Sequence, residues 1–118
     1  MKRVLIVDGD EVRRVYLERE LNKIYEVHLC TRGDQAVQLI EELRPDALII
    51  NLALPYLDGF TVLGWLKHRP PAILALTNLI SNRIIEDAAA LGVRDMLLYP
   101  CSIKTIVAHL EVLLCART

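Results

Sequence analysis

The sequence lacks the features that would point to a membrane or to a nucleic acid. No apolar run is long enough to span a bilayer, and Asp8 interrupts the apolar start of the chain after four residues, too early for a signal peptide. The formal net charge is only −1, which gives no electrostatic reason to expect binding to nucleic acid or to a membrane surface. There is also no internal repeat, low-complexity tract or linker, so we expect a single domain over residues 1–118.

Cysteines are few and irregularly spaced. Cys30, Cys101 and Cys115 are odd in number and show no CxxC spacing, which favours reduced thiols in a cytoplasmic protein over a disulfide scaffold or a zinc site. Each lies among apolar neighbours and is expected to be a small buried residue.

The most informative part of the sequence is residues 47–60. The run 47–52 is short, rich in Ile and Leu, and carries one polar residue, Asn51, near its end; this pattern is typical of a strand buried on both faces. Pro55 and the pair Asp58-Gly59 then predict a loop. In an open parallel sheet, the carboxyl ends of the strands line the crevice where ligands bind, so Asn51 is expected in that crevice.

Strand-like and helix-like segments alternate along the rest of the chain. Strands are predicted at residues 4–7, 27–31, 47–52, 73–76 and 96–98, and each is followed by apolar residues at helical spacing. In the first helix, Asp10 is placed to cap the N-terminus, and Val12, Val15, Tyr16 and Leu21 form the predicted apolar face. Five alternations with short connections predict a doubly wound α/β fold, with a parallel five-stranded sheet and helices on both faces.

Four segments in this order resemble the receiver domain of bacterial two-component response regulators, the CheY-like family. They are V-L-I-V-D, P-D-A-L-I-I-N-L-A-L-P-Y-L-D-G-F, L-A-L-T and A-L-G-V-R-D-M-L-L-Y-P, and the resemblance extends over about residues 2–114. It implies a flavodoxin-like fold with strand order 2-1-3-4-5. It also implies two-component signalling through a phosphorelay, in which an aspartate ending the third strand takes a phosphoryl group from a histidine kinase.

The resemblance implies further working groups, and only two of these positions match. In the family, two acids after the first strand hold Mg²⁺. A Thr or Ser after the fourth strand and a Lys after the fifth contact the phosphoryl oxygens. An aromatic residue on the fifth strand changes rotamer as the signalling state changes. Asp8 matches the first acid and Thr77 matches the hydroxyl. The four departures are Gly9 at the second acid, Asn51 at the phospho-acceptor, Tyr99 at the lysine and Met96 at the switch aromatic.

These departures change the chemistry that the crevice supports. An acyl phosphate forms on an ionised carboxylate, and the neutral amide of Asn51 is a poor nucleophile. Mg²⁺ prefers oxygen ligands that include one or two carboxylates; with Asp8 as the only matched acid, we expect no cofactor, or at most weak Mg²⁺ binding at Asp8. Tyr99 offers no fixed cation in place of the lysine. We therefore expect an atypical receiver, or pseudo-receiver, that is a signalling and protein-interaction module and not an enzyme.

Several alternatives stay open at this stage. Asp8 is either a hydrogen-bonded remnant or a residual metal ligand. Asp10 is either an N-cap or a substitute metal ligand. The Tyr99 ring either fills the crevice or points to solvent. Asn51 is expected to bridge the crevice loops, and Thr77 to satisfy nearby backbone. A phosphorylatable receiver using Asp8 or Asp10 with an altered Mg²⁺ site is the second hypothesis. An unrelated small-molecule binder ranks last, because the acidic residues 8–11 disfavour a phosphate.

The resemblance also implies where a partner binds. In receivers, the face formed by the fourth helix, fifth strand and fifth helix carries dimerisation or effector contacts. In this chain that face has charges of both signs, which favour one relative position of the partner more than high affinity. We expect a protein partner or a homodimer there, or an effector domain outside this chain, and no nucleic acid or membrane. The residues assigned to this face are Arg83, Glu86, Asp87, Arg94, Asp95, Lys104 and Glu111.

Overall fold

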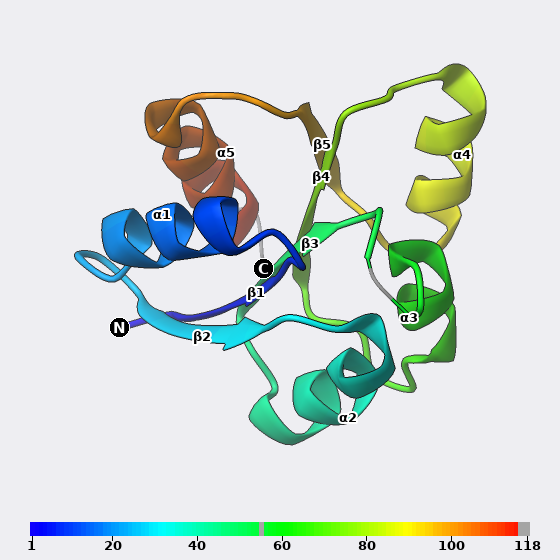
Figure 1. Ribbon diagram of the computed structural model, residues 1–118, viewed down its shortest axis with the longest axis horizontal. Coiled ribbons are helices and arrows are strands. Elements are labelled where there is room, and N and C mark those ends of the chain that lie inside the picture. Colours follow the sequence, from blue (N-terminus) through cyan, green and yellow to red (C-terminus); the bar gives the residue numbers. More distant parts are fainter. Residues whose placement is uncertain (55, 116–118) are drawn as a thin grey trace.

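Five parallel strands form one sheet between two layers of helices (Figure 1). The computed structural model describes residues 1–54 and 56–115; Pro55, where the sequence predicts a loop, and the last three residues of the predicted single domain lie outside them. The elements are β1 Arg3–Val7, α1 Glu11–Leu21, β2 Glu26–Cys30, α2 Gly33–Leu43, β3 Ala47–Asn51, α3 Gly59–Trp65, β4 Ala72–Thr77, α4 Asn82–Ala90, β5 Asp95–Leu98 and α5 Ile103–Cys115. The strand order β2-β1-β3-β4-β5 confirms the predicted flavodoxin-like fold.

The two faces of the sheet are covered by different helices. α1 and α5 pack on one face and α2, α3 and α4 lie on the other (Figure 1). Alternate residues of each central strand enter the two cores: Val4 and Ile6 of β1 face α1 and α5, whereas Leu5 and Val7 face α2 and α3. Because both faces are covered, these strands are continuously apolar, as the sequence indicated.

The register of the sheet determines what meets at its carboxyl edge. Val7 is paired with Ile50, so Asp8 and Asn51, which directly follow them, are level with each other on adjacent strands. On the other side of β3, Asn51 is paired with Leu76, the residue before Thr77. The polar residues that end three neighbouring strands therefore lie together, as the sequence predicts.

The predicted apolar face of α1 is wrong in part. Val12 and Val15 are 82% and 49% exposed, whereas Leu17 and Leu21 are fully buried. Residues 13, 17 and 21 share one stripe of a helix; since this stripe faces the sheet, residues 12 and 15 are turned outward. Leu17 and Leu21 thus anchor α1, and its outer surface keeps apolar side chains.

The cysteines are also less uniform than expected. Within the described residues all three are free thiols: Cys30 is buried, Cys101 is half-buried and Cys115 is exposed. Burial raises the pKa of the Cys30 and Cys101 thiols. None of the helices in residues 1–54 and 56–115 has both the length and the apolar character needed to cross a membrane.

Candidate functional site

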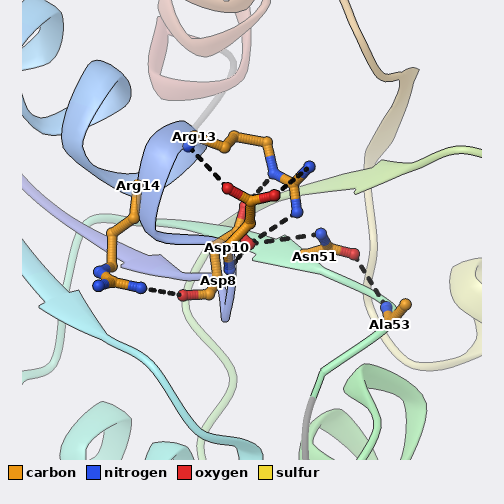
Figure 2. A network of polar contacts seen from close by, with 6 residues as sticks. All are labelled: Asp8, Asp10, Arg13, Arg14, Asn51 and Ala53. Atoms are coloured by element: carbon orange, nitrogen blue, oxygen red, sulfur yellow. Dashed lines mark hydrogen bonds and ion pairs between the residues drawn. The ribbon is translucent and has the colours of Figure 1, made fainter.

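Asp8 is the centre of the polar cluster at the carboxyl edge of the sheet (Figure 2). Its side chain is 1% exposed, and both carboxylate oxygens receive hydrogen bonds from one guanidinium. Arg13 Nε donates to Oδ2 at 2.5 Å and Arg13 Nη2 donates to Oδ1 at 2.9 Å. The backbone N–H of Asp10 adds a third bond to Oδ1 at 2.9 Å. Such a bidentate, charge-assisted pair is among the strongest polar interactions available to a protein.

The start of α1 positions Arg13 for this contact. Asp10 is the N-cap, as predicted, and its carboxylate accepts a hydrogen bond from the backbone N–H of Arg13 at 3.0 Å. That bond is the main cause of the lowered pKa of Asp10. Helical side chains tilt toward the N-terminus of their helix, so the Arg13 side chain reaches back over the first turn to Asp8. The hydrogen bond to Asp8 raises the pKa of the Arg13 guanidinium further above its usual value.

Tyr99, the residue directly after β5, contacts the same guanidinium. The Arg13 Cζ atom lies over the ring of Tyr99, 4.8 Å from its centroid, a cation–π distance. The ring is half-buried against the core beneath α1 and α5, and this burial is the main cause of the raised pKa of the Tyr99 hydroxyl. Of the two alternatives for Tyr99, the structure therefore favours a ring that packs into the site over one that points to solvent.

Asn51 connects the loops after β1 and β3. Its amide oxygen accepts a hydrogen bond from the backbone N–H of Ala53 at 2.9 Å, and its amide nitrogen lies 3.5 Å from Asp8 Oδ1 (Figure 2). The first distance is that of an ordinary hydrogen bond, and the second is at the limit of hydrogen-bond distance. The bond to Ala53 lies within the loop after β3, so the contact between the two loops is the 3.5 Å one to Asp8.

The remaining matched and substituted positions do not face Asp8 with a reactive group. The Thr77 hydroxyl accepts from the Leu79 N–H at 3.2 Å and donates to the Leu79 carbonyl at 3.0 Å, so it stabilises its own turn. Met96 is half-buried and packs on the opposite side of the sheet, in the core beneath α2, α3 and α4. Gly9 has no side chain to contribute.

These residues do not fit a magnesium site. The Asp8 oxygens are held by a guanidinium, and the Asn51 oxygen is held by a backbone N–H. Mg²⁺ requires free, hard oxygen ligands in a near-octahedral arrangement. Among the described residues, moreover, no group of three or more His, Cys, Asp or Glu side chains could hold a metal ion.

Sequence comparison identifies the family to which this fold belongs. The family model for the response regulator receiver domain matches residues 4–111. The chain belongs to the response regulator receiver domain family. Response regulator MprA of Mycobacterium sp. (strain KMS) is 32% identical over 117 residues, which cover 95% of this chain and 50% of that protein. The receiver described here therefore spans about half the length of the curated relatives that it matches.

Solved structures support the same fold. The Francisella response regulator 1452 receiver domain covers 100% of both chains at a TM-score of 0.90 and 23% identity. Chemotaxis protein CheY4 of Vibrio cholerae has a TM-score of 0.85 and 26% identity, over 96% of this chain and 98% of that one.

Arg13 is the site residue that the sequence reasoning missed. Tyr99, at the position of the family lysine, supplies no cation, and Arg13 of α1 supplies one instead. A signal was available: Asp10 predicts the helix start, Arg13 is then its third residue, and the tilt of helical side chains aims that residue at the end of β1.

The residues assigned to the partner face divide into two groups. Those on α4 are exposed, and Arg83 lies 3.8 Å from Asp87 in the same helix. Asp95 of β5 hydrogen-bonds to His109 Nδ1 of α5. Lys104 and Glu111, in contrast, line a hollow of about 410 Å³ between α5 and the end of α1. The five residues on α4 and around the start of β5 are Arg83, Glu86, Asp87, Arg94 and Asp95.

Proposed function

We propose that this receiver is a pseudo-receiver, a protein-interaction module of two-component signalling that is not switched by phosphorylation at Asn51. The proposal is carried by one observation: the buried carboxylate of Asp8 is paired with Arg13, beside an amide where receivers that accept phosphate need an acid. The guanidinium is a cation supplied by the chain itself. Asp8 therefore has its charge compensated without a metal ion and without a phosphoryl group.

The pairing also opposes phosphoryl transfer to another residue. A guanidinium that hydrogen-bonds to a carboxylate stabilises its negative charge and so makes it a weaker nucleophile. Both Asp8 oxygens are engaged by Arg13, and Asp8 is almost completely shielded from solvent. In this proposal the pocket holds one conformation, and signalling depends on partners that recognise it.

We further propose that residues 1–118 act as one domain in the cytoplasm, without a cofactor and without enzymatic activity of their own. The partner is a protein that binds at α4 and β5, where Arg83, Glu86 and Asp87 present both signs of charge. Exposed charges of mixed sign favour a specific register more than high affinity. An effector domain outside residues 1–118 is one such partner, and nucleic acid and membrane are not.

Intact-mass spectrometry after incubation with acetyl phosphate and Mg²⁺ tests the central proposal. We expect no added phosphoryl group on the unmodified chain. The matched positive control carries Gly9→Asp, Asn51→Asp and Tyr99→Lys, which restore the family's acids and lysine, and it should gain one phosphoryl group. A phosphoryl adduct on the unmodified chain at a level similar to that of this control would rule out the pseudo-receiver.

A phosphorylatable receiver remains the second candidate because of Asp10. Its side chain is 48% exposed, and the backbone N–H of Arg13 lowers the pKa of its carboxyl group. If the unmodified chain gains a phosphoryl group, Asp10→Asn and Asp8→Asn variants identify the acceptor, because only the variant that lacks it should lose the added mass.

A further inference from the structure

The outer face of α1 carries apolar side chains that the fold leaves open to solvent. Val12 is 82% exposed and Val15 is 49% exposed, although exposed helix surfaces are usually polar. A hollow of about 610 Å³ runs along them. Its lining combines four apolar or aromatic side chains with charges of both signs: Val12, Val15, Tyr16 and Tyr99, together with Asp10, Glu11, Arg13 and Arg19.

The charges at the two ends of this surface are opposite and equally spaced from its centre. Glu11 precedes Val15 by four residues and Arg19 follows it by four, so each lies about one helical turn, or roughly 6 Å, from Val15. Glu11 is exposed. The Arg19 side chain is 69% exposed, with its Nε 3.6 Å from the Glu20 carboxylate, and it is therefore accessible to a second partner.

We propose that this α1 face binds a second copy of the chain, with the two α1 helices antiparallel about a two-fold axis at Val15. In this arrangement Val15 meets Val15 of the second copy, and Glu11 lies opposite Arg19 of the second copy. The two-fold axis creates the same pair again with the roles of the subunits exchanged. A parallel arrangement would instead place Glu11 against Glu11, so the charges select the antiparallel one.

A second copy fits this surface better than a strongly charged partner. A basic partner would be repelled at Arg19 and an acidic one at Glu11, whereas the surface is complementary to itself. The formal net charge of −1 per chain produces little repulsion between two copies. The lining also contains two tyrosines and an arginine, Arg13, which are residue types enriched in protein–protein interfaces.

The α1 surface is separate from the α4 and β5 surface of the proposed function, and it does not depend on that proposal. Because the apolar centre is small, we expect a weak dimer, with a dissociation constant of about 10 µM to 1 mM. Sedimentation equilibrium of the unmodified chain over this concentration range, at low salt and without a phosphodonor, measures it directly.

Charge reversal tests the geometry. Glu11→Arg and Arg19→Glu each place like charges together at both rims and should raise the dissociation constant about five-fold or more. The double variant Glu11→Arg/Arg19→Glu restores opposite charges and should return the constant to near its original value. Arg83→Glu on α4 is the matched control, because Arg83 is exposed on a different face, and it should leave the constant unchanged. Circular dichroism establishes that each variant is folded.

Three results would overturn the proposed dimer. The first is a chain that stays monomeric at about 1 mM. The second is a dimer that Arg83→Glu disrupts and the α1 variants do not, which would place the interface at α4. The third is a double variant as weak as the single ones, which would exclude the Glu11–Arg19 pairing. A phosphoryl adduct in the mass experiment would contradict the proposed function and leave these results unaffected.

Discussion

Replacing Arg13 by Gln should destabilise the protein through the carboxylate that Arg13 leaves behind. Asp8 is 1% exposed, and without the guanidinium it keeps the Asp10 N–H at 2.9 Å and the distant Asn51 amide at 3.5 Å. A buried charge that loses its partner retains its desolvation penalty without the attraction that offset it. The effect should therefore exceed that of losing an ordinary surface arginine.

The structure sets the size of the effect. Removing one partner of a fully buried ion pair costs about 3–5 kcal/mol. The Arg13 side chain is 20% exposed, so water reaches one side of the pair, and we lower the expected loss to about 2–3 kcal/mol. For a chain of this length, that loss lowers the melting temperature by about 6–12 °C.

Urea denaturation and calorimetry of matched variants measure this loss. Arg14→Gln is the control, because Arg14 donates only one bond, at 3.2 Å, to the backbone carbonyl of Asp8; its loss should stay below about 1 kcal/mol. Adding Asp8→Asn to Arg13→Gln removes the unpaired charge and should restore part of the stability. Equal losses for the two arginine variants, or no recovery on adding Asp8→Asn, would refute the buried ion pair.

Three further predictions concern the fold, and urea denaturation measures each. Gly33→Ala should lower the free energy of unfolding by about 1–3 kcal/mol or more, because a Cβ there would lie 1.8 Å from a backbone oxygen of the β3–α3 loop. Gly64→Ala in α3, with its nearest neighbour at 3.9 Å, should instead raise it by about 0.5–1 kcal/mol; a similar loss for both would contradict the close approach at Gly33. Leu17→Ala should cost about 2–5 kcal/mol and Val12→Ala less than about 0.5 kcal/mol; the reverse order would show that α1 is rotated differently. The pKa of Asp58 is lowered from 3.8, chiefly by the backbone N–H that it caps. The stabilisation of the fold by this carboxylate is therefore complete above the unfolded-state pKa and is lost as the pH falls through the lower folded-state pKa. Asp58→Asn should keep the cap and flatten the dependence of the free energy of unfolding on pH in this range, and an unchanged dependence would contradict the role of Asp58.

Local signals explain why much of the fold was predictable. The central strands are short apolar runs with turn residues at both ends, and parallel strands must place those ends at one edge. From this, Asn51 could be placed at the carboxyl edge; its place beside the end of β1 follows from the strand order that the resemblance to receiver domains implies. The N-cap role of Asp10 and the local role of Thr77 also follow from short-range hydrogen bonds that need only a few consecutive residues.

The orientation of α1 could not be predicted in the same way. Its apolar residues Val12, Val15, Leu17 and Leu21 do not form one stripe, so the spacing leaves more than one face available for burial. Contact with the sheet selected Leu17 and Leu21, and the pairing of Arg13 with Asp8 satisfied the buried carboxylate on the same stripe. The free energy that favours this orientation of α1 comes from removing its side chains from water, and that removal occurs only when the sheet is in place.

The sequence by itself determined the alternation of strands and helices, the strands buried on both faces, and the absence of an acid at Asn51, because these depend on residue type and on neighbours along the chain. Only the tertiary structure decided that Arg13 neutralises Asp8, that Tyr99 packs against that guanidinium, and that α1 turns two valines outward. These features depend on which side chains are brought together from α1, β1 and β5 and on how completely water is removed from between them.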